Sequence, residues 1–171
     1  ALTQPVGDSR CDRTLIEIDR DLTAELSVRF PEAGLINQDV MTIDFNAFAG
    51  KSPLRIIGNL PYNISTPLLF KLFDAGEHIH DMHFMLQREV VDRMTALPST
   101  KAYGRLSVMA QLHCHTEKLF EVPPQAFSPR PKVQSAIIRL TPHNKATDVD
   151  KKLLESILTQ AFSMRRKPIR N

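Results

Sequence analysis

The sequence predicts an α/β protein with a doubly wound sheet that ends in one reversed strand. Apolar runs alternate with segments of helical periodicity over most of the chain, which is typical of a largely parallel sheet covered by helices. Two strand-like runs, residues 118–122 and 133–140, are joined by a proline-rich link without a helix. Strands joined in this way pair antiparallel, so the last strand is expected to be reversed. The 171 residues suffice for one sizeable core and the start of a second unit.

The composition is that of a globular protein, and it argues against several other classes. Neither the 42% hydrophobic nor the 24% charged content departs from that of an ordinary domain. No apolar run approaches the ~20 residues of a membrane span, and the N-terminus lacks a signal-peptide pattern. Two cysteines, Cys11 and Cys114, without Cys-x-x-Cys spacing fit a reducing compartment, so we expect a cytoplasmic protein. The net charge of +3 mildly favours a polyanionic partner.

The N-terminal elements follow from short apolar runs and their polar ends. The run at residues 14–19 ends in acids and predicts a strand. Asp21 is then expected to cap a helix that buries Leu22, Leu26 and Phe30. Two further strands are predicted, a brief one at residues 34–37 and a buried parallel one at residues 54–57.

The second half of the chain continues this alternation and then changes. The predicted elements are a helix with Thr66 as its N-cap and Pro67 at its first position, running to about Ala75, and a buried strand at 82–86. Helical segments at 89–94 and 105–114 and the hairpin at 118–140 follow. Residues 142–146 are interpreted as a linker, and Asp148 or Asp150 as the start of an amphipathic helix. We therefore expect two units, residues 1–143 and residues 144–171.

A stiff loop at residues 58–67 is the central candidate for chemistry. Asn59 leaves an amide at the carboxyl end of the preceding strand, Pro61 keeps the chain extended, and Tyr62 presents a flat ring. Ligands of open α/β sheets bind at this edge. The alternative is a plain strand-to-helix connection, in which Asn59 caps a turn and Tyr62 packs on a neighbour.

Two acids lie at the ends of successive predicted strands, upstream of Asn59. Glu17 stands where a carboxylate can accept both ribose hydroxyls of a nucleoside cofactor. Asp39 can accept an adenine amino hydrogen while Val40 packs on the ring. Taken singly, Glu17 is equally well explained as a surface acid and Asp39 as an Asx-turn residue. Together with Asn59 they form a group of polar side chains at the ends of predicted strands, which favours a binding site.

An aromatic ring and two cations share the proline-rich link of the hairpin. Four prolines restrict where the ring of Phe127 can go, and Arg130 and Lys132 follow it closely. This combination suits a base-stacking wall with phosphate contacts nearby. A ring tucked into the core at the tip of a hairpin is an equal alternative.

Other polar clusters are weaker candidates. A basic group near the C-terminal end can bind RNA phosphates or form a solvated helix end; it consists of Arg165, Arg166 and Lys167. The histidines lie in two groups, at 78–83 and 113–115, and neither supplies a convincing set of four ligands. We therefore expect no metal site.

Five segments carry a resemblance to a known family. They are residues 17–22 (EIDRDL), 38–41 (QDVM), 58–67 (GNLPYNISTP), 104–108 (GRLSV) and 126–133 (AFSPRPKV). In this order they resemble the ribosomal RNA adenine N6,N6-dimethyltransferases of the KsgA/Dim1 family, and the likeness covers nearly the whole chain. Leu60 favours the small-subunit branch, because the Erm methyltransferases of large-subunit RNA usually carry isoleucine there. The resemblance implies a Rossmann-like class I methyltransferase sheet with a reversed C-terminal strand, plus the start of a small helical domain.

The resemblance also implies the cofactor, the partner and the roles of individual residues. S-adenosylmethionine is the expected cofactor, and its expected site consists of Glu17, Ile18, Asp39, Val40 and Asn59. Two adjacent adenosines of small-subunit ribosomal RNA, in a pre-30S particle, are the expected substrate of a monomeric enzyme. Asn59 and the Leu60 carbonyl would face the target amine, between Tyr62 and Phe127. The expected RNA contacts are Arg130, Lys132, Arg165, Arg166 and Lys167.

The chain departs from the family pattern at both ends. The family's first strand, with its glycine-rich loop, has no counterpart, and only the first helix of the family's C-terminal domain is present. We therefore expect a fragment that by itself binds S-adenosylmethionine weakly or not at all. Two other functions stay open: a non-catalytic RNA-binding ribosome assembly factor, and a methyltransferase acting on DNA or protein amines.

Overall fold

The computed structural model describes residues 11–48, 53–61, 63–143 and 149–163. Its strands are β1 (Thr14–Glu17), β2 (Gly34–Asn37), β3 (Leu54–Asn59), β4 (Ile79–Gln87), β5 (Cys114–Val122) and β6 (Ser135–Pro142). Its α-helices are α2 (Arg20–Arg29), α3 (Ser65–Asp74), α4 (Arg88–Met94), α5 (Arg105–His113) and α6 (Lys151–Ser163). Short 3-10 helices are η1 (Val40–Thr42), η2 (Phe45–Phe48), η3 (Gly76–His78) and η4 (Pro124–Ala126). The predicted α/β class is confirmed.

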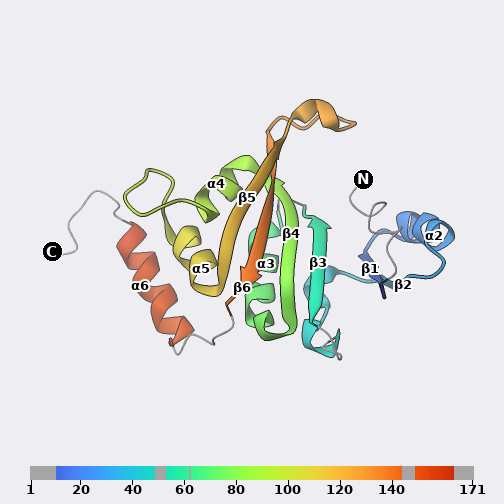
Figure 1. Cartoon of the computed structure of the whole chain (residues 1–171), viewed down its shortest axis with the longest axis horizontal. Helices are drawn as coiled ribbons and strands as arrows, with labels where there is room; N and C mark the ends of the chain where they lie inside the picture. The colour runs from blue at the N-terminus through green and yellow to red at the C-terminus, as the bar shows by residue number, and fades with distance from the viewer. Residues whose placement is uncertain (1–10, 49–52, 62, 144–148, 164–171) are drawn as a thin grey trace.

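The hydrogen-bonded strands form two sheets (Figure 1). β1 and β2 pair in parallel, and the larger sheet has the order β3-β4-β6-β5. Within it, β3 and β4 are parallel, whereas β6 is antiparallel to both of its neighbours. The reversed strand expected from the helix-free link is therefore confirmed. The sequence did not predict that the described ladders divide in two, because apolar runs indicate strands but not which strand edges pair.

The first helix differs from the prediction in its start and its burial. Asp19, not Asp21, is the N-cap of α2, and its side chain accepts hydrogen bonds from the Asp21 and Leu22 amides. None of the α2 residues is buried, and Leu22 is 47% exposed. The predicted burial of Leu22 was wrong, because its spacing suggested an apolar face but not which element would cover it.

The loop after β3 enters α3 two residues earlier than predicted. α3 begins at Ser65, and its N-cap position is Ile64, which makes no side-chain capping bond. The predicted cap at Thr66 was therefore wrong. Ser65 is instead buried in the first turn, and Pro67 still lies where a missing N–H costs nothing.

The predicted strands exist, and β3, β4 and β5 are longer than the apolar runs that predicted them. β1 is shorter, because it ends at Glu17, and β3 has no buried residue although burial was expected. β3 extends to Asn59 because this residue still pairs with Met85 of β4. β5 begins at Cys114, directly after α5, although the sequence suggested that the helix would include this residue. Pairing with β6 extends β5, which is mostly exposed after Cys114 and therefore gave no apolar signal at residues 115–117.

The core lies on one face of β4 and β6. Alternate residues of a strand point to the same face, and Met82, Phe84 and Leu86 of β4 are at most 1% exposed. Side chains from α3, α4, α5 and β6 complete this core; examples are Leu69, Val91, Ala110 and Ile138. The same core contains Leu60, so the candidate loop is attached to the best-packed part of the protein.

One carboxylate is buried at the amino end of β4, away from the candidate loop. Asp81 is 1% exposed, and its Oδ2 lies 3.6 Å from Arg55 and 3.5 Å from Arg139. His80 and His83 also face it, at 3.2 and 3.9 Å. In the described part of the chain, no group of three or more histidine, cysteine or acidic side chains could hold a metal ion. Within the same residues, no helix has both the length and the apolar character needed to cross a bilayer.

Burial gives Cys114 a distinct expected reactivity. Desolvation raises the pKa of its thiol from 9.0 to about 12, and the residue is 1% exposed. The thiolate fraction near neutral pH should fall on the order of 1,000-fold, so a thiol reagent should label the exposed Cys11 rapidly and Cys114 only after unfolding. Counting labelled thiols with and without denaturant measures this. Rapid native labelling at Cys114 would contradict its burial.

The same shift makes stability depend on alkaline pH. The native thiol holds its proton more tightly than the unfolded thiol. The contribution of Cys114 to the free energy of unfolding is therefore complete below pH 9.0 and is lost as the pH rises toward about 12. Cys114→Ala should remove this part of the pH dependence, which thermal unfolding of both variants across that range can measure.

Candidate functional site

Asn59 and Leu60 lie at the carboxyl end of β3, as predicted. Asn59 is exposed and pairs with Met85 in the parallel ladder, and the Leu60 amide donates to the Met85 carbonyl at 3.3 Å. The Leu60 side chain is 8% exposed and belongs to the core. Neither the Asn59 side chain nor the Leu60 carbonyl oxygen has a hydrogen bond to any described residue. Among the described residues, these two acceptors at the end of β3 therefore have no hydrogen-bond partner.

Gly58 makes this close packing possible. A Cβ at this position would lie 3.1 Å from Cδ2 of Leu60 and 3.4 Å from the Phe84 ring. Both neighbours are buried, so neither can move away without disturbing the core. The glycine thus allows the backbone beside Asn59 to lie directly on the core.

The end of β1 is held to the end of β2 by an asparagine that the sequence analysis did not single out. Asn37 pairs with Glu17, and its side-chain amide donates to the Glu17 carbonyl at 2.9 Å and the Ile18 carbonyl at 3.1 Å. Glu17 accepts the Asp19 amide through Oε1 at 3.0 Å, and Ile18 is 64% exposed. The sequence did contain a signal for Asn37, because an amide residue ends the strand that neighbours the one carrying Glu17.

Asp39 and Val40 follow β2 and connect this small sheet to the rest of the protein. Asp39 caps η1 by accepting the Met41 amide at 2.9 Å, so the Asx-turn interpretation is confirmed for one of its oxygens. Val40 packs against the main core. Lys71 of α3 donates to the Met41 carbonyl at 2.5 Å. The segment after Asp39 is thereby attached to the helix that follows the Asn59 loop.

The hairpin brings a third segment to the same edge of the large sheet. Gln87 at the end of β4 pairs with Ser135 at the start of β6, which pairs with Val122 at the end of β5. The 123–134 loop therefore projects from the edge at which β3 and β4 end (Figure 1). Phe127 is half-buried in this loop. Since it is not in the core, the alternative of a ring tucked into the core is not what the structure has.

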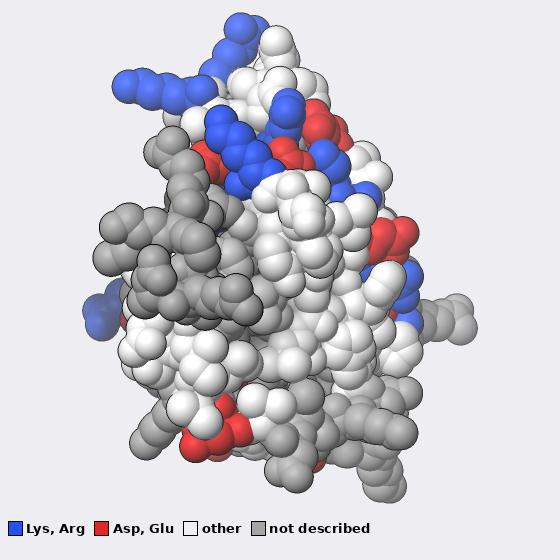
Figure 2. Space-filling model, turned by 90° about the vertical axis from the view of Figure 1, so that its left-hand side faces the viewer, with Lys and Arg blue, Asp and Glu red and all other residues white. Residues whose placement is uncertain are grey.

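Positively charged side chains lie near this edge of the sheet. Arg130 and Lys132 are exposed in the 123–134 loop. Figure 2 shows lysine and arginine side chains gathered on the upper part of the face that includes β5, with acidic side chains among them. Arg165, Arg166, Lys167 and Tyr62 lie outside the described residues. Their assigned roles stay predictions, as do those of the other candidate residues.

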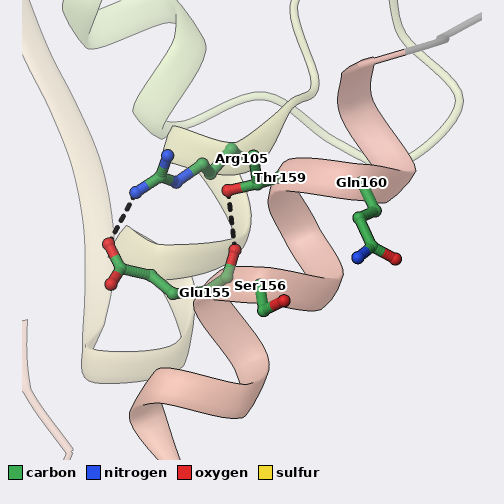
Figure 3. A pocket seen from close by; sticks show the side chains of 5 residues that line it. All are labelled: Arg105, Glu155, Ser156, Thr159 and Gln160. Carbon is green, nitrogen blue, oxygen red and sulfur yellow. Dashed lines mark hydrogen bonds and ion pairs between the residues drawn. The ribbon is translucent and has the colours of Figure 1, made fainter.

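A hollow elsewhere on the surface contains none of the predicted site residues. It has a volume of about 360 Å³, lies between α5 and α6, and is lined by Arg105, Glu155, Ser156, Thr159 and Gln160 (Figure 3). Arg105 and Glu155 form an ion pair at 2.6 Å across it. This pair attaches α6 to α5, and both of its side chains are partly exposed, so we interpret the hollow as a seam between helices.

Comparisons with known proteins converge on one family. Residues 1–171 match a family model described as Ribosomal RNA adenine dimethylase. The chain is 53% identical, over 178 residues, to proteins from Escherichia coli strains named Ribosomal RNA small subunit methyltransferase A. These alignments cover 100% of the chain and 65% of each relative, so the chain spans less than two thirds of the relatives' length.

Two solved structures have a similar fold. A dimethyladenosine transferase from Plasmodium falciparum matches with a TM-score of 0.82 at 28% identity, covering 92% of this chain and 57% of that one. The 23S rRNA methyltransferase ErmE matches with a TM-score of 0.77 at 25% identity, covering 98% of this chain and 68% of that one. These matches confirm the predicted class I methyltransferase architecture.

Proposed function

Since the chain belongs to the ribosomal RNA adenine dimethylase family, we propose that the protein transfers methyl groups from S-adenosylmethionine to the N6 amine of adenines. The substrate we propose is small-subunit ribosomal RNA in a pre-30S particle, with two adjacent adenosines as targets. We further propose that the protein acts in the cytoplasm as a monomer. The names of the relatives support the RNA and the subunit.

The observation that carries this proposal is the pair of acceptors at the end of β3. The Asn59 side-chain oxygen and the Leu60 backbone carbonyl lie at a strand end that the core holds in place, and neither has a hydrogen bond to a described residue. An exocyclic adenine amine has two hydrogens to donate, and two fixed acceptors can orient it. An ordinary turn asparagine would instead use its oxygen on a local backbone N–H.

The acids at the ends of β1 and β2 fit S-adenosylmethionine. Glu17 and Asp39 each use one carboxylate oxygen on a local amide, and the second oxygen of each has no hydrogen bond to a described residue. Glu17 would accept from the ribose hydroxyls and Asp39 from the adenine amino group, with Ile18 and Val40 as apolar neighbours. When bound, the cofactor supplies an electrophilic methyl group.

The residues at the β3 end would act mainly through orientation and electrostatics. The adenine amine is a poor nucleophile because its lone pair is delocalised into the ring, and holding its hydrogens directs that lone pair outward. Positive charge grows on the nitrogen during transfer, and the carbonyl dipoles of Asn59 and Leu60 stabilise it. Each transfer would form one N–C bond while the bond between the methyl carbon and the sulfonium sulfur breaks. The donor would leave as a neutral thioether, and the amine would release one proton to water. Phe127 and Tyr62 would stack on the base, which must leave its helix to reach them.

Single-turnover methyl transfer to small ribosomal subunits by the full-length protein tests the proposal, with RNA affinity measured in parallel. Transfer to N6 of adenine is the expected result. Tight RNA binding without transfer would favour the alternative of a non-catalytic assembly factor.

The basic group Arg165, Arg166 and Lys167 should contribute RNA affinity that does not depend on sequence. Neutralising all three should reduce the slope of log affinity against log salt by roughly two to three units, if each contacts a phosphate. Titration of RNA at several salt concentrations measures the slope. An unchanged slope would leave these residues as a solvated helix end.

A further inference from the structure

A network of charged side chains joins α4 to β5 directly below the projecting hairpin. Lys118 donates to Asp92 at 2.9 Å and to Glu121 at 3.1 Å. Arg88 completes the network, at 3.3 Å from Asp92 and 3.5 Å from Glu121. Figure 2 shows blue and red side chains intermixed on this face, below the cations at its upper end. These four residues, two cations and two anions, are called the clamp below.

Arg88 extends the clamp to the other strand of the hairpin. Its amide donates to the Gln134 carbonyl at 2.9 Å, and its guanidinium donates to the Gln134 side chain at 2.5 Å. Glu121 lies at the end of β5, and Gln134 lies immediately before β6. One arginine at the start of α4 therefore holds both sides of the hairpin at the point where the ladder ends.

The loop above this point has few other attachments. Within residues 123–134, all of which the structure describes, the backbone bonds of Ala126 to Pro123 and of Phe127 to Pro124 are local. The bond from the Arg88 amide to Gln134 is the one backbone hydrogen bond between this loop and a described residue outside the hairpin. Four prolines restrict the loop's internal freedom, so its orientation depends mainly on its base.

Contacts within the clamp shift the pKa values of Asp92 and Lys118. Partial burial acts to raise the pKa of Asp92, yet that pKa is lowered, because Lys118 and Arg88 donate hydrogen bonds to the carboxylate. The pKa of Lys118 is raised, since Asp92 and then Glu121 accept hydrogen bonds from it. The side chains are between 34% and 45% exposed, so a single pair contributes little. The joint effect of several contacts on one small segment is what can fix its position.

The clamp also connects the loop to the candidate site. Arg88 follows β4 directly, and Met85 of β4 is the partner of Asn59. Three short steps thus link Asn59 to the loop: the strand pairing of Asn59 with Met85, the chain from Met85 to Arg88, and the hydrogen bond from Arg88 to the base of the loop. We propose that Arg88, Asp92, Lys118 and Glu121 are positioning residues, which hold the 123–134 loop so that Phe127 meets the adenine presented to Asn59. This inference rests on the proposed function for its consequence, but not for its structural claim.

The structural claim can be tested without any activity. Asp92→Asn removes the anion that binds both cations, and Glu89→Gln is the matched control, because Glu89 is exposed on the same helix and has no ion pair with a described residue. In the loop, trypsin can cleave after Lys132 but not after Arg130, which precedes a proline. Native cleavage after Lys132 should be about 5- to 30-fold faster in Asp92→Asn and unchanged in Glu89→Gln. Equal cleavage rates in the two variants would contradict the claim that the clamp holds the 123–134 loop in place.

The functional consequence needs the full-length protein. Lys118→Met should slow single-turnover methyl transfer by up to about 100-fold while RNA affinity stays within about twofold, and Lys118→Arg should restore the rate because it keeps the charge. Loss of thermal stability in Lys118→Met without a slower transfer would overturn the positioning role. Absence of methyl transfer by the unaltered protein would contradict the proposed function instead, and the cleavage rates would still decide whether the clamp exists.

Discussion

Replacing Asn59 with alanine in the full-length protein is expected to lower single-turnover methyl transfer by roughly 10²–10³-fold. The amide oxygen is one of two acceptors at the carboxyl end of β3, and its interaction strengthens as positive charge develops on the amine. RNA affinity should change little, since phosphate contacts supply most of it. The measurement is transfer to small ribosomal subunits beside an RNA titration.

Two further variants isolate the role of the Asn59 oxygen. Asn59→Asp keeps an acceptor in place and should retain more activity than alanine. Asn46→Ala makes the same chemical change at an exposed asparagine of η2 and should behave as the unaltered protein. Near-normal transfer by Asn59→Ala would end the catalytic assignment. Parallel loss of transfer, RNA affinity and thermal stability would mean that Asn59 maintains the loop's shape instead.

The second large effect is expected for Phe127→Ala. Its ring is half-buried in the 123–134 loop, on the edge of the sheet where β3 and β4 end. Stacking on a base is worth about 1–3 kcal/mol, so capture of the target adenine should weaken by roughly 5- to 150-fold. The loss should appear as a higher RNA concentration needed for half-maximal transfer, and the transfer rate should partly recover at high RNA concentration. This separates Phe127 from Asn59, whose loss would persist at saturation.

Phe120→Ala is the matched control for the aromatic ring. Phe120 is 59% exposed on β5, in the same hairpin but outside the loop. If stacking at one defined point matters, Phe120→Ala should leave capture unchanged. Equal defects in both variants would indicate a general apolar contribution of the hairpin.

The sequence by itself determined the class of the fold and the position of its chemistry along the chain. Alternation of apolar runs with helical periodicity was sufficient to predict the α/β class, and the helix-free link predicted the reversed β6. Asn59 could be assigned to the end of β3 because the apolar run stops at Gly58. These features are local, since they depend on the spacing and type of neighbouring residues.

Tertiary structure alone decided how distant segments meet. Ser135 pairs with Gln87 on one side and with Val122 on the other. This antiparallel register carries Phe127 to the edge where Asn59 lies, although nearly seventy positions separate them. The contacts of Asn37 could not be predicted, because its three acceptors come from the end of β1 and from α2. The clamp was equally hidden, since its charges belong to α4 and β5 and resemble any solvated surface in the sequence. Apolar spacing records which residues prefer burial, but only the packed chain fixes which strands pair and therefore which polar side chains face one another.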